Sequence, residues 1–172
     1  TMNAVEAQGD RMENGVWVEG PPEKTSDYRY YVHTVAEFLE SQNVNVGIYD
    51  EAYIIIDEDS ARVAALSRFL NDIGITTRLD ITFLIFSEAQ GNIPNYEAWY
   101  YAQRLSTYLS EVDINNVWGP QNPNRLLIDQ PRNYIDGLIR FFDLLGIKVI
   151  KIEGGIEFLS QESANFRRKD RG

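Results

Sequence analysis

The sequence predicts an α+β protein of two tandem, diverged ferredoxin-like modules (βαββαβ) that arose by internal duplication. The first observation is a repeat: residues 54–75 and 126–147 align without a gap at an offset of 72, and seven of the 22 aligned pairs are identical. The second is that each copy reads as a buried strand, an aspartate, an amphipathic helix and a glycine stop. The third is a weaker echo at an offset of 70, which matches Tyr30 with Tyr100.

The first module is expected to cover residues 15–81, after a flexible arm at 1–14. Its β-branched and aromatic runs predict strands, and apolar residues spaced three to four apart predict helices. In chain order the segments are a strand at 15–19, a helix at 28–42, strands at 44–49 and 52–56, a helix between Asp57 and Gly74, and a strand at 75–79. Asp57 is the expected cap of the second helix, and Ser26 or Asp27 that of the first.

The second module is expected to cover residues 82–160, with a closing hairpin, before a basic tail at 161–172. Its segments are a strand at 82–86, a helix at 95–112, strands at 114–118 and 126–128, a helix from Pro131 to Gly146, and a hairpin of 147–152 with 156–159. Two crossovers joined by a hairpin give an antiparallel sheet with both helices on one face. A competing grouping divides the chain into helix–hairpin repeats, in which 156–159 belongs to the last unit. The two groupings differ only in strand pairing.

Composition narrows the classes of function. The chain has 172 residues, a hydrophobic share of 44%, no cysteine and a formal net charge of −10. Disulfides and thiol chemistry are thereby excluded, and the acidic charge disfavours nucleic acid as a partner. No run reaches the ~18 apolar residues of a transmembrane helix, and no signal peptide opens the sequence. We therefore expect a cytoplasmic protein without a nucleic-acid or membrane partner.

Four carboxylates at or near the ends of strands that precede helices form a candidate metal site: Glu19, Asp57, Glu88 and Asp129. The first and third strands of each module are expected to lie adjacent and parallel, which places Glu19 near Asp57 and Glu88 near Asp129. Paired carboxylates at strand ends can hold Mg²⁺ for phosphoryl chemistry. The simpler interpretation, which we favour, is that the aspartates cap helices and the glutamates are solvated. No metal and no cofactor is therefore predicted.

Aromatic residues crowd the start of the first helix in each module. They are Tyr28, Tyr30 and Tyr31 in one module and Tyr96, Trp99, Tyr100 and Tyr101 in the other. A helix with one inward face cannot bury consecutive tyrosines, so Tyr31 is expected inside and Tyr30 outside. Exposed tyrosine and tryptophan are typical of binding hot spots. The candidate partner-binding residues are therefore Tyr30, Tyr96, Trp99 and Tyr100.

Two arginines, Arg68 and Arg140, occupy matched positions late in the two repeated helices. A cation near a helix C-terminus is favourable, and Asp72 is placed as an i,i+4 partner for Arg68. We interpret both arginines as structural, with an anion site formed by the two as the alternative.

These residues indicate a binding function more than a catalytic one. The leading hypothesis is a non-enzymatic protein-interaction or assembly module, whose aromatic helix starts and acidic surface bind a protein partner with a basic face or a second copy of the chain. The first alternative is a regulatory module that binds a small molecule between its two pseudo-symmetric halves. The second alternative is a Mg²⁺-dependent enzyme that uses the strand-end carboxylates.

Overall fold

The computed structural model describes residues 11–13, 16–18, 27–91 and 93–161, and its side chains from residue 27 onward. Within them lie four helices: α2 (Tyr28–Ser41), α3 (Ser60–Asp72), α4 (Ala98–Glu111) and α5 (Arg132–Leu145). The first four-stranded sheet contains β3 (Val46–Tyr49), β4 (Tyr53–Ile56), β5 (Thr77–Asp80) and β6 (Phe83–Phe86). The second contains β7 (Asn116–Val117), β8 (Arg125–Ile128), β9 (Val149–Ile152) and β10 (Gly155–Phe158). A separate hairpin joins β1 (Arg11–Glu13) to β2 (Val16–Val18).

Every neighbouring pair of strands in the two large sheets is antiparallel. The strand order is β3-β4-β6-β5 in the first sheet and β7-β8-β10-β9 in the second. The expected α+β class is therefore confirmed, with two four-stranded antiparallel sheets and four helices, roughly as in two ferredoxin-like modules.

Strand pairing follows the helix–hairpin grouping. β2 pairs with β1, and β6, expected to open the second module, lies in the first sheet between β4 and β5. The expected parallel contact between first and third strands is wrong. The reason is local: only Ile81 and Thr82 separate β5 from β6, and a connection that short allows antiparallel pairing at a small cost in loop entropy.

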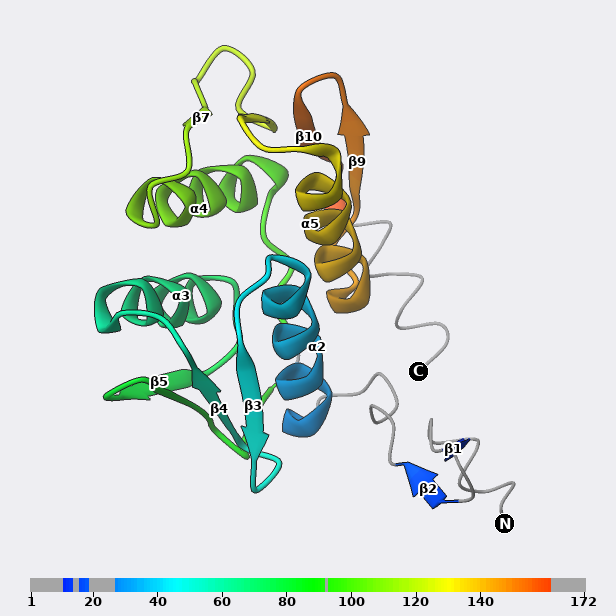
Figure 1. The fold of residues 1–172 in the computed structure, drawn as a ribbon. Coiled ribbons are helices and arrows are strands. Elements are labelled where there is room, and N and C mark those ends of the chain that lie inside the picture. Colours follow the sequence, from blue (N-terminus) through cyan, green and yellow to red (C-terminus); the bar gives the residue numbers. More distant parts are fainter. Residues whose placement is uncertain (1–10, 14–15, 19–26, 92, 162–172) are drawn as a thin grey trace.

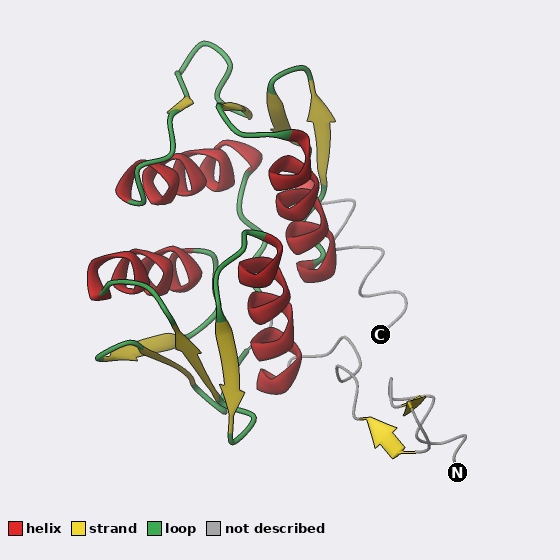
Figure 2. Cartoon of the chain, in the orientation of Figure 1, coloured by secondary structure: helices red, strands yellow, loops and turns green. Residues whose placement is uncertain are grey.

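The helices form two inner layers between the two sheets (Figure 1). α2 and α3 pack on the first sheet, and α4 and α5 pack on the second. Between the halves, α2 packs against α5 and α3 against α4. Figure 2 shows the resulting order of strand, helix, helix and strand layers. The core follows from the period-two alternation of the strands, since Ile54 and Ile56 are buried while Ile55 is 39% exposed.

Aromatic contacts between the helix layers come in a matched pair. The rings of Phe38 and Phe141 stack at 4.6 Å, and those of Tyr108 and Phe69 stack at 5.2 Å. The sequence repeat matches Phe38 with Tyr108 and Phe141 with Phe69. Each stack thus joins the first helix of one half to the second helix of the other. This is the reciprocal pattern of a two-fold interface, in which residue i contacts j and j contacts i.

Helix starts differ from the sequence expectation in two places. Asp27 caps α2, because its Oδ1 accepts a hydrogen bond of 2.8 Å from the backbone N–H of Arg29. α3 is capped by Asp59, which accepts from the N–H of Arg62 at 3.0 Å, so the assignment of Asp57 as the cap is wrong. At α5 the capping position is held by Pro131, with no side-chain hydrogen bond, and Asp129 is not the cap. In both helices the capping position lies two residues after the expected aspartate.

Candidate functional site

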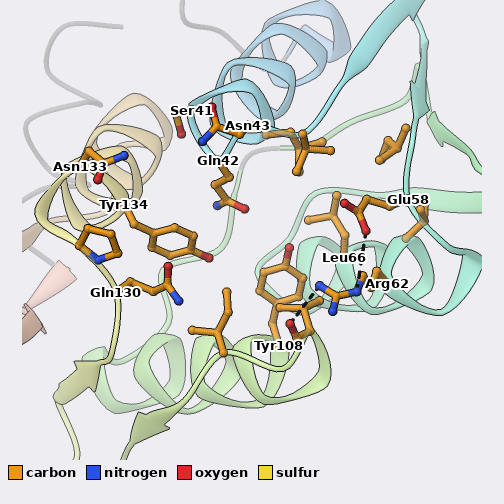
Figure 3. Close-up of a pocket in the computed structure, with 17 residues that line it drawn as sticks. Ser41, Gln42, Asn43, Glu58, Arg62, Leu66, Tyr108, Gln130, Asn133 and Tyr134 are labelled. Carbon is orange, nitrogen blue, oxygen red and sulfur yellow. Dashed lines mark hydrogen bonds and ion pairs between the residues drawn. The ribbon is translucent and has the colours of Figure 1, made fainter.

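A pocket of about 320 Å³ lies between the two halves (Figure 3). The C-terminal ends of α2 and α4 and the first turns of α3 and α5 surround it. Its lining combines polar side chains with aliphatic ones, and the aliphatic residues come from both halves: Leu39, Val44, Ile56, Val63, Leu66, Val112 and Ile114. A concave site between two packed units that presents both aliphatic side chains and converging polar groups can hold a small molecule.

The lining residues include pairs that the sequence repeat matches. Val44 corresponds to Ile114 at an offset of 70, and Glu58 corresponds to Gln130 at an offset of 72. Arg62 corresponds in the same way to Tyr134. The pocket therefore lies where the two halves present equivalent segments to each other, although several of the matched side chains differ in chemistry.

Tyr134 is one of two deeply buried tyrosines that line the pocket. It sits in the first turn of α5, is only 7% exposed, and its hydroxyl has no hydrogen-bond partner among the described residues. Burial raises the pKa of this phenol, and the nearby Tyr108 raises it further. The Nε2 of Gln42, at the C-terminal cap of α2, is also buried without a partner in the described part of the chain. A buried polar group without a partner costs free energy, so each is a candidate for contact with a ligand.

Tyr108 completes a converging set of polar groups. It is 5% exposed, and Figure 3 shows its hydroxyl and that of Tyr134 pointing toward the centre of the pocket, below the amide of Gln42. Burial raises the pKa of Tyr108; the Arg62 guanidinium partly opposes this, and Glu58 adds to it. Both phenols therefore stay protonated at neutral pH and can donate hydrogen bonds.

The guanidinium of Arg62 forms one wall of the pocket and is already occupied. It donates to the carbonyl oxygen of Val112 at 3.1 Å and to Asp113 at 3.2 Å. It also lies 3.8 Å from Glu58 and 3.7 Å from Asp59. The bonds to Val112 and Asp113 tie α3 to the end of α4 across the two halves, which gives this arginine a structural role at the rim.

The candidate metal carboxylates are not brought together. Glu19 lies outside the described residues, while Asp57, Glu88 and Asp129 are all exposed. The expected neighbourhood of Glu88 and Asp129 is wrong, because β6 and β8, which precede them, belong to different sheets. Among the described residues, no group of three or more histidine, aspartate or glutamate side chains is arranged to hold a metal ion.

The structure corrects the predicted exposure of Tyr30. This ring is 7% exposed, and its hydroxyl donates to the carbonyl oxygen of Leu144 at 2.7 Å. Tyr31 is buried too, at 5%. Consecutive tyrosines are both inside because α2 is covered on two sides, by its own sheet and by α5. The expectation failed because it allowed the helix a single inward face.

The other three aromatic candidates form a cluster at the start of α4. Tyr100 is partly buried, and its hydroxyl donates to the carbonyl oxygen of Asp72 at 2.8 Å. The Arg104 guanidinium lies over the Tyr100 ring, 5.3 Å from its centroid. Tyr96 packs against Tyr100 with ring centroids 4.3 Å apart, and Trp99 is 40% exposed. Trp99 is therefore the ring of this cluster that is most available to a partner.

The matched arginines both pair across the halves. Arg68 donates to Glu111 at 3.1 Å, and Arg140 pairs with Glu37. Asp72, the expected partner of Arg68, instead lies 3.6 Å from Arg104. The structural interpretation of the arginines is favoured, and their partners come from the facing helix layer.

Sequence reasoning missed the pocket residues Tyr108 and Tyr134. The sequence does contain a signal for them, because each interrupts the similarity between the two aligned segments. Tyr108 is aligned with Phe38, and Tyr134 is aligned with Arg62. A hydroxyl added where the other copy has a phenylalanine is a candidate for a function that only one half performs.

Comparison with protein families, with curated proteins and with solved structures found no match. In the part of the chain that the structure describes, none of the helices combines the length and apolar character needed to cross a bilayer. The described residues form an α+β protein with two four-stranded antiparallel sheets, four helices and a pocket between the two helix layers.

Proposed function

We propose that this protein binds a small molecule in the pocket between its two halves and acts as a ligand-responsive regulatory module. The single observation that carries the proposal is the hydroxyl of Tyr134, which is buried, lacks a partner among the described residues and points into the pocket. Such a group is costly in the free protein and becomes favourable when a ligand pairs with it.

The position of the pocket supports a regulatory role. A ligand there contacts residues of both halves, so its binding energy depends on how the halves are docked. The crossed aromatic stacks and the matched strand order support a further part of the proposal, that the halves are diverged duplicates of one ancestral module. In the absence of cysteine, we propose that the protein works in the cytoplasm.

The test is a thermal-shift screen of uncharged metabolites against wild type and Tyr134→Phe. The variant removes an unpaired buried hydroxyl, so the free protein should be as stable as wild type or more so. A ligand at 100 times its Kd stabilises the wild type by about 2.7 kcal/mol, and that gain should shrink in the variant. Tyr53→Phe, on the outer face of the first sheet, is the matched control. Equal ligand shifts in all three proteins would contradict the proposal.

A second candidate function is binding of a protein partner, and the outer face of the first sheet favours it. Tyr49 is 57%, Ile55 39% and Phe83 38% exposed on that face. An antiparallel sheet with one solvated face normally carries polar side chains there, and exposed apolar patches mark interaction sites. The net charge of −10 suits a partner with a basic rim. Trp99, at the start of α4, is a further exposed apolar residue outside this face.

Paired substitutions test this second candidate. Ile55→Lys with Phe83→Glu, which places opposite charges at directly paired positions of β4 and β6, should abolish capture of a partner, or self-association measured by light scattering, with little change in the urea midpoint. Leu127→Lys, at a 43% exposed position on the outer face of the second sheet, is the control. Association that survives the double substitution would rule out this face.

A further inference from the structure

We infer that the pocket between the halves selects an uncharged ligand with an apolar body and a carbonyl-type acceptor edge. This inference rests on the function proposed above and deepens it by naming the ligand class. Three features of the described residues carry it: the pairing of the charged groups, the kind of hydrogen-bonding atom left unpaired, and the aliphatic part of the lining.

An anion finds no available cation in the pocket. Arg62 is the cationic residue among the lining side chains, and its guanidinium already faces Glu58, Asp59 and Asp113 as well as the carbonyl oxygen of Val112. An anionic ligand would have to compete with these three carboxylates for one positive charge. It would also have to be desolvated beside Glu58, which is unfavourable.

A cationic ligand is also disfavoured in this pocket. Glu58 is the carboxylate among the lining residues, and it already lies 3.8 Å from Arg62. If Glu58 paired with a cationic ligand instead, the positive charge of Arg62 would lose part of its compensation. The charged pair therefore acts as a neutral wall, and an uncharged ligand avoids the desolvation cost that either kind of ion would meet.

The buried polar atoms that lack a partner are best satisfied by a hydrogen-bond acceptor on the ligand. The Nε2 of Gln42 is a hydrogen-bond donor, and the hydroxyl of Tyr134 can donate as well as accept; both are shielded from solvent, and neither has a partner among the described residues, so an acceptor on the ligand can satisfy both. Figure 3 shows the amide of Gln130 beside the Tyr134 ring. Gln130 is exposed, so its side chain can turn aside. A ligand carbonyl oxygen can then reach one or both donors.

The aliphatic part of the lining suits an apolar ring. Leu66 and Val63 form the wall on the α3 side, and Val112 lies at the end of α4. The volume of about 320 Å³ is near the lower end of the range for ligand sites, which fits a molecule of one or two rings.

Three probes of one shape test the charge selection: benzamide, benzoate and benzamidinium, which are neutral, anionic and cationic. Saturation-transfer NMR with the full chain should give a strong signal for benzamide and little for the two ions. Loss of one hydrogen bond should weaken benzamide about fivefold in Tyr134→Phe, while Tyr53→Phe should bind as the wild type does. The benzamide signal should also be independent of salt, since no ion pair is formed.

Each outcome separates the inference from the proposed function. Benzoate or benzamidinium binding as well as benzamide, with sensitivity to Tyr134→Phe, would overturn the uncharged class and leave the site standing. Benzamide binding that ignores Tyr134→Phe would overturn the role of its hydroxyl as the donor. If no probe contacts the wild-type protein, the proposed function fails with the inference. Near-ultraviolet circular dichroism of the variant establishes that a lost signal is not lost folding.

Discussion

The hydroxyl of Tyr30 donates a hydrogen bond of 2.7 Å to the backbone carbonyl oxygen of Leu144, joining the start of α2 to the last turn of α5. The matched tyrosine, Tyr100, donates at 2.8 Å to the carbonyl oxygen of Asp72, at the end of α3. The offsets of 70 and 72 that match the tyrosines and the acceptors are those of the sequence repeat. Each half therefore uses the same tyrosine to hold the exposed end of the other half's second helix, since those last carbonyls have no partner within the helix.

Removing these hydroxyls should destabilise the joint. Tyr30→Phe is expected to lower the free energy of unfolding by about 1 kcal/mol, because a neutral hydrogen bond to a carbonyl is lost. Tyr100→Phe should cost the same or less, since Tyr100 is more exposed and water can replace its hydroxyl. Urea melts of both variants and of Tyr53→Phe, the surface control, provide the measurement. A Tyr30→Phe protein as stable as wild type would mean that the bond contributes nothing to docking.

The cap of α3 gives a test that separates two nearby aspartates. Asp59→Ala should cost about 1 kcal/mol, because the backbone N–H of Arg62 loses its side-chain acceptor. Asp59→Asn should be close to neutral, since asparagine caps equally well. Asp57→Ala should stay within ~0.5 kcal/mol, as an exposed residue away from the cap. Chemical denaturation that ranks Asp57→Ala as the more damaging change would restore the sequence-based assignment.

Ile81, in the turn between β5 and β6, is a site where stability can be gained. It is 78% exposed and has φ of 61°, a left-handed conformation that β-branched residues disfavour. Ile81→Gly should raise the free energy of unfolding by roughly 0.5–1 kcal/mol, since relief of the strain outweighs the extra freedom of the unfolded chain. Ile81→Asn should give part of the gain. Thermal melts showing a loss in both variants would indicate that the isoleucine side chain stabilises the hairpin.

Alkaline pH should weaken the protein through its buried phenols. Burial raises the pKa of Tyr30 from 10 to about 12, and it raises the pKa of Tyr108 and Tyr134 as well. The folded state holds these protons more tightly than the unfolded chain, so their stabilising contribution is complete below pH 10 and is lost as the pH rises toward 12. Urea midpoints across this range should fall, and less steeply in Tyr30→Phe. A flat profile would show that the phenols ionise normally in the folded protein.

Much of the secondary structure was accessible from the sequence because it depends on local patterns. The apolar stripe and the glycine stop placed α5 between Pro131 and Gly146, and Gly146 takes the left-handed conformation at φ of 81°. The strand runs were also found, since β-branched segments such as 52–56 are strand-like in any context. Strand pairing was harder, because both groupings of the chain use the same strands.

The candidate site likewise depends on packing between distant segments, which local sequence patterns do not predict. Tyr134 and Tyr108 lie 26 residues apart in the chain (134 − 108), on different helices, and only the packing of α4 and α5 on one sheet turns both toward one pocket. Tyr30 was expected outside because a helix pattern records how much of its surface is apolar, not how many neighbours will cover it. Its burial depends on α5, more than a hundred residues away in sequence.

The sequence by itself determined the four helices, most of the strands and the acidic, cysteine-free character of the chain, because these depend on composition and on contacts within a few residues. The tertiary structure decided which strands pair, which aspartate caps α3, and that the aromatic helix start of the first half serves the joint between the halves. It also decided where a pocket lies and which donors in it lack partners. Those features arise where segments distant in the chain meet, and their energies depend on burial from several sides at once, which no local pattern encodes.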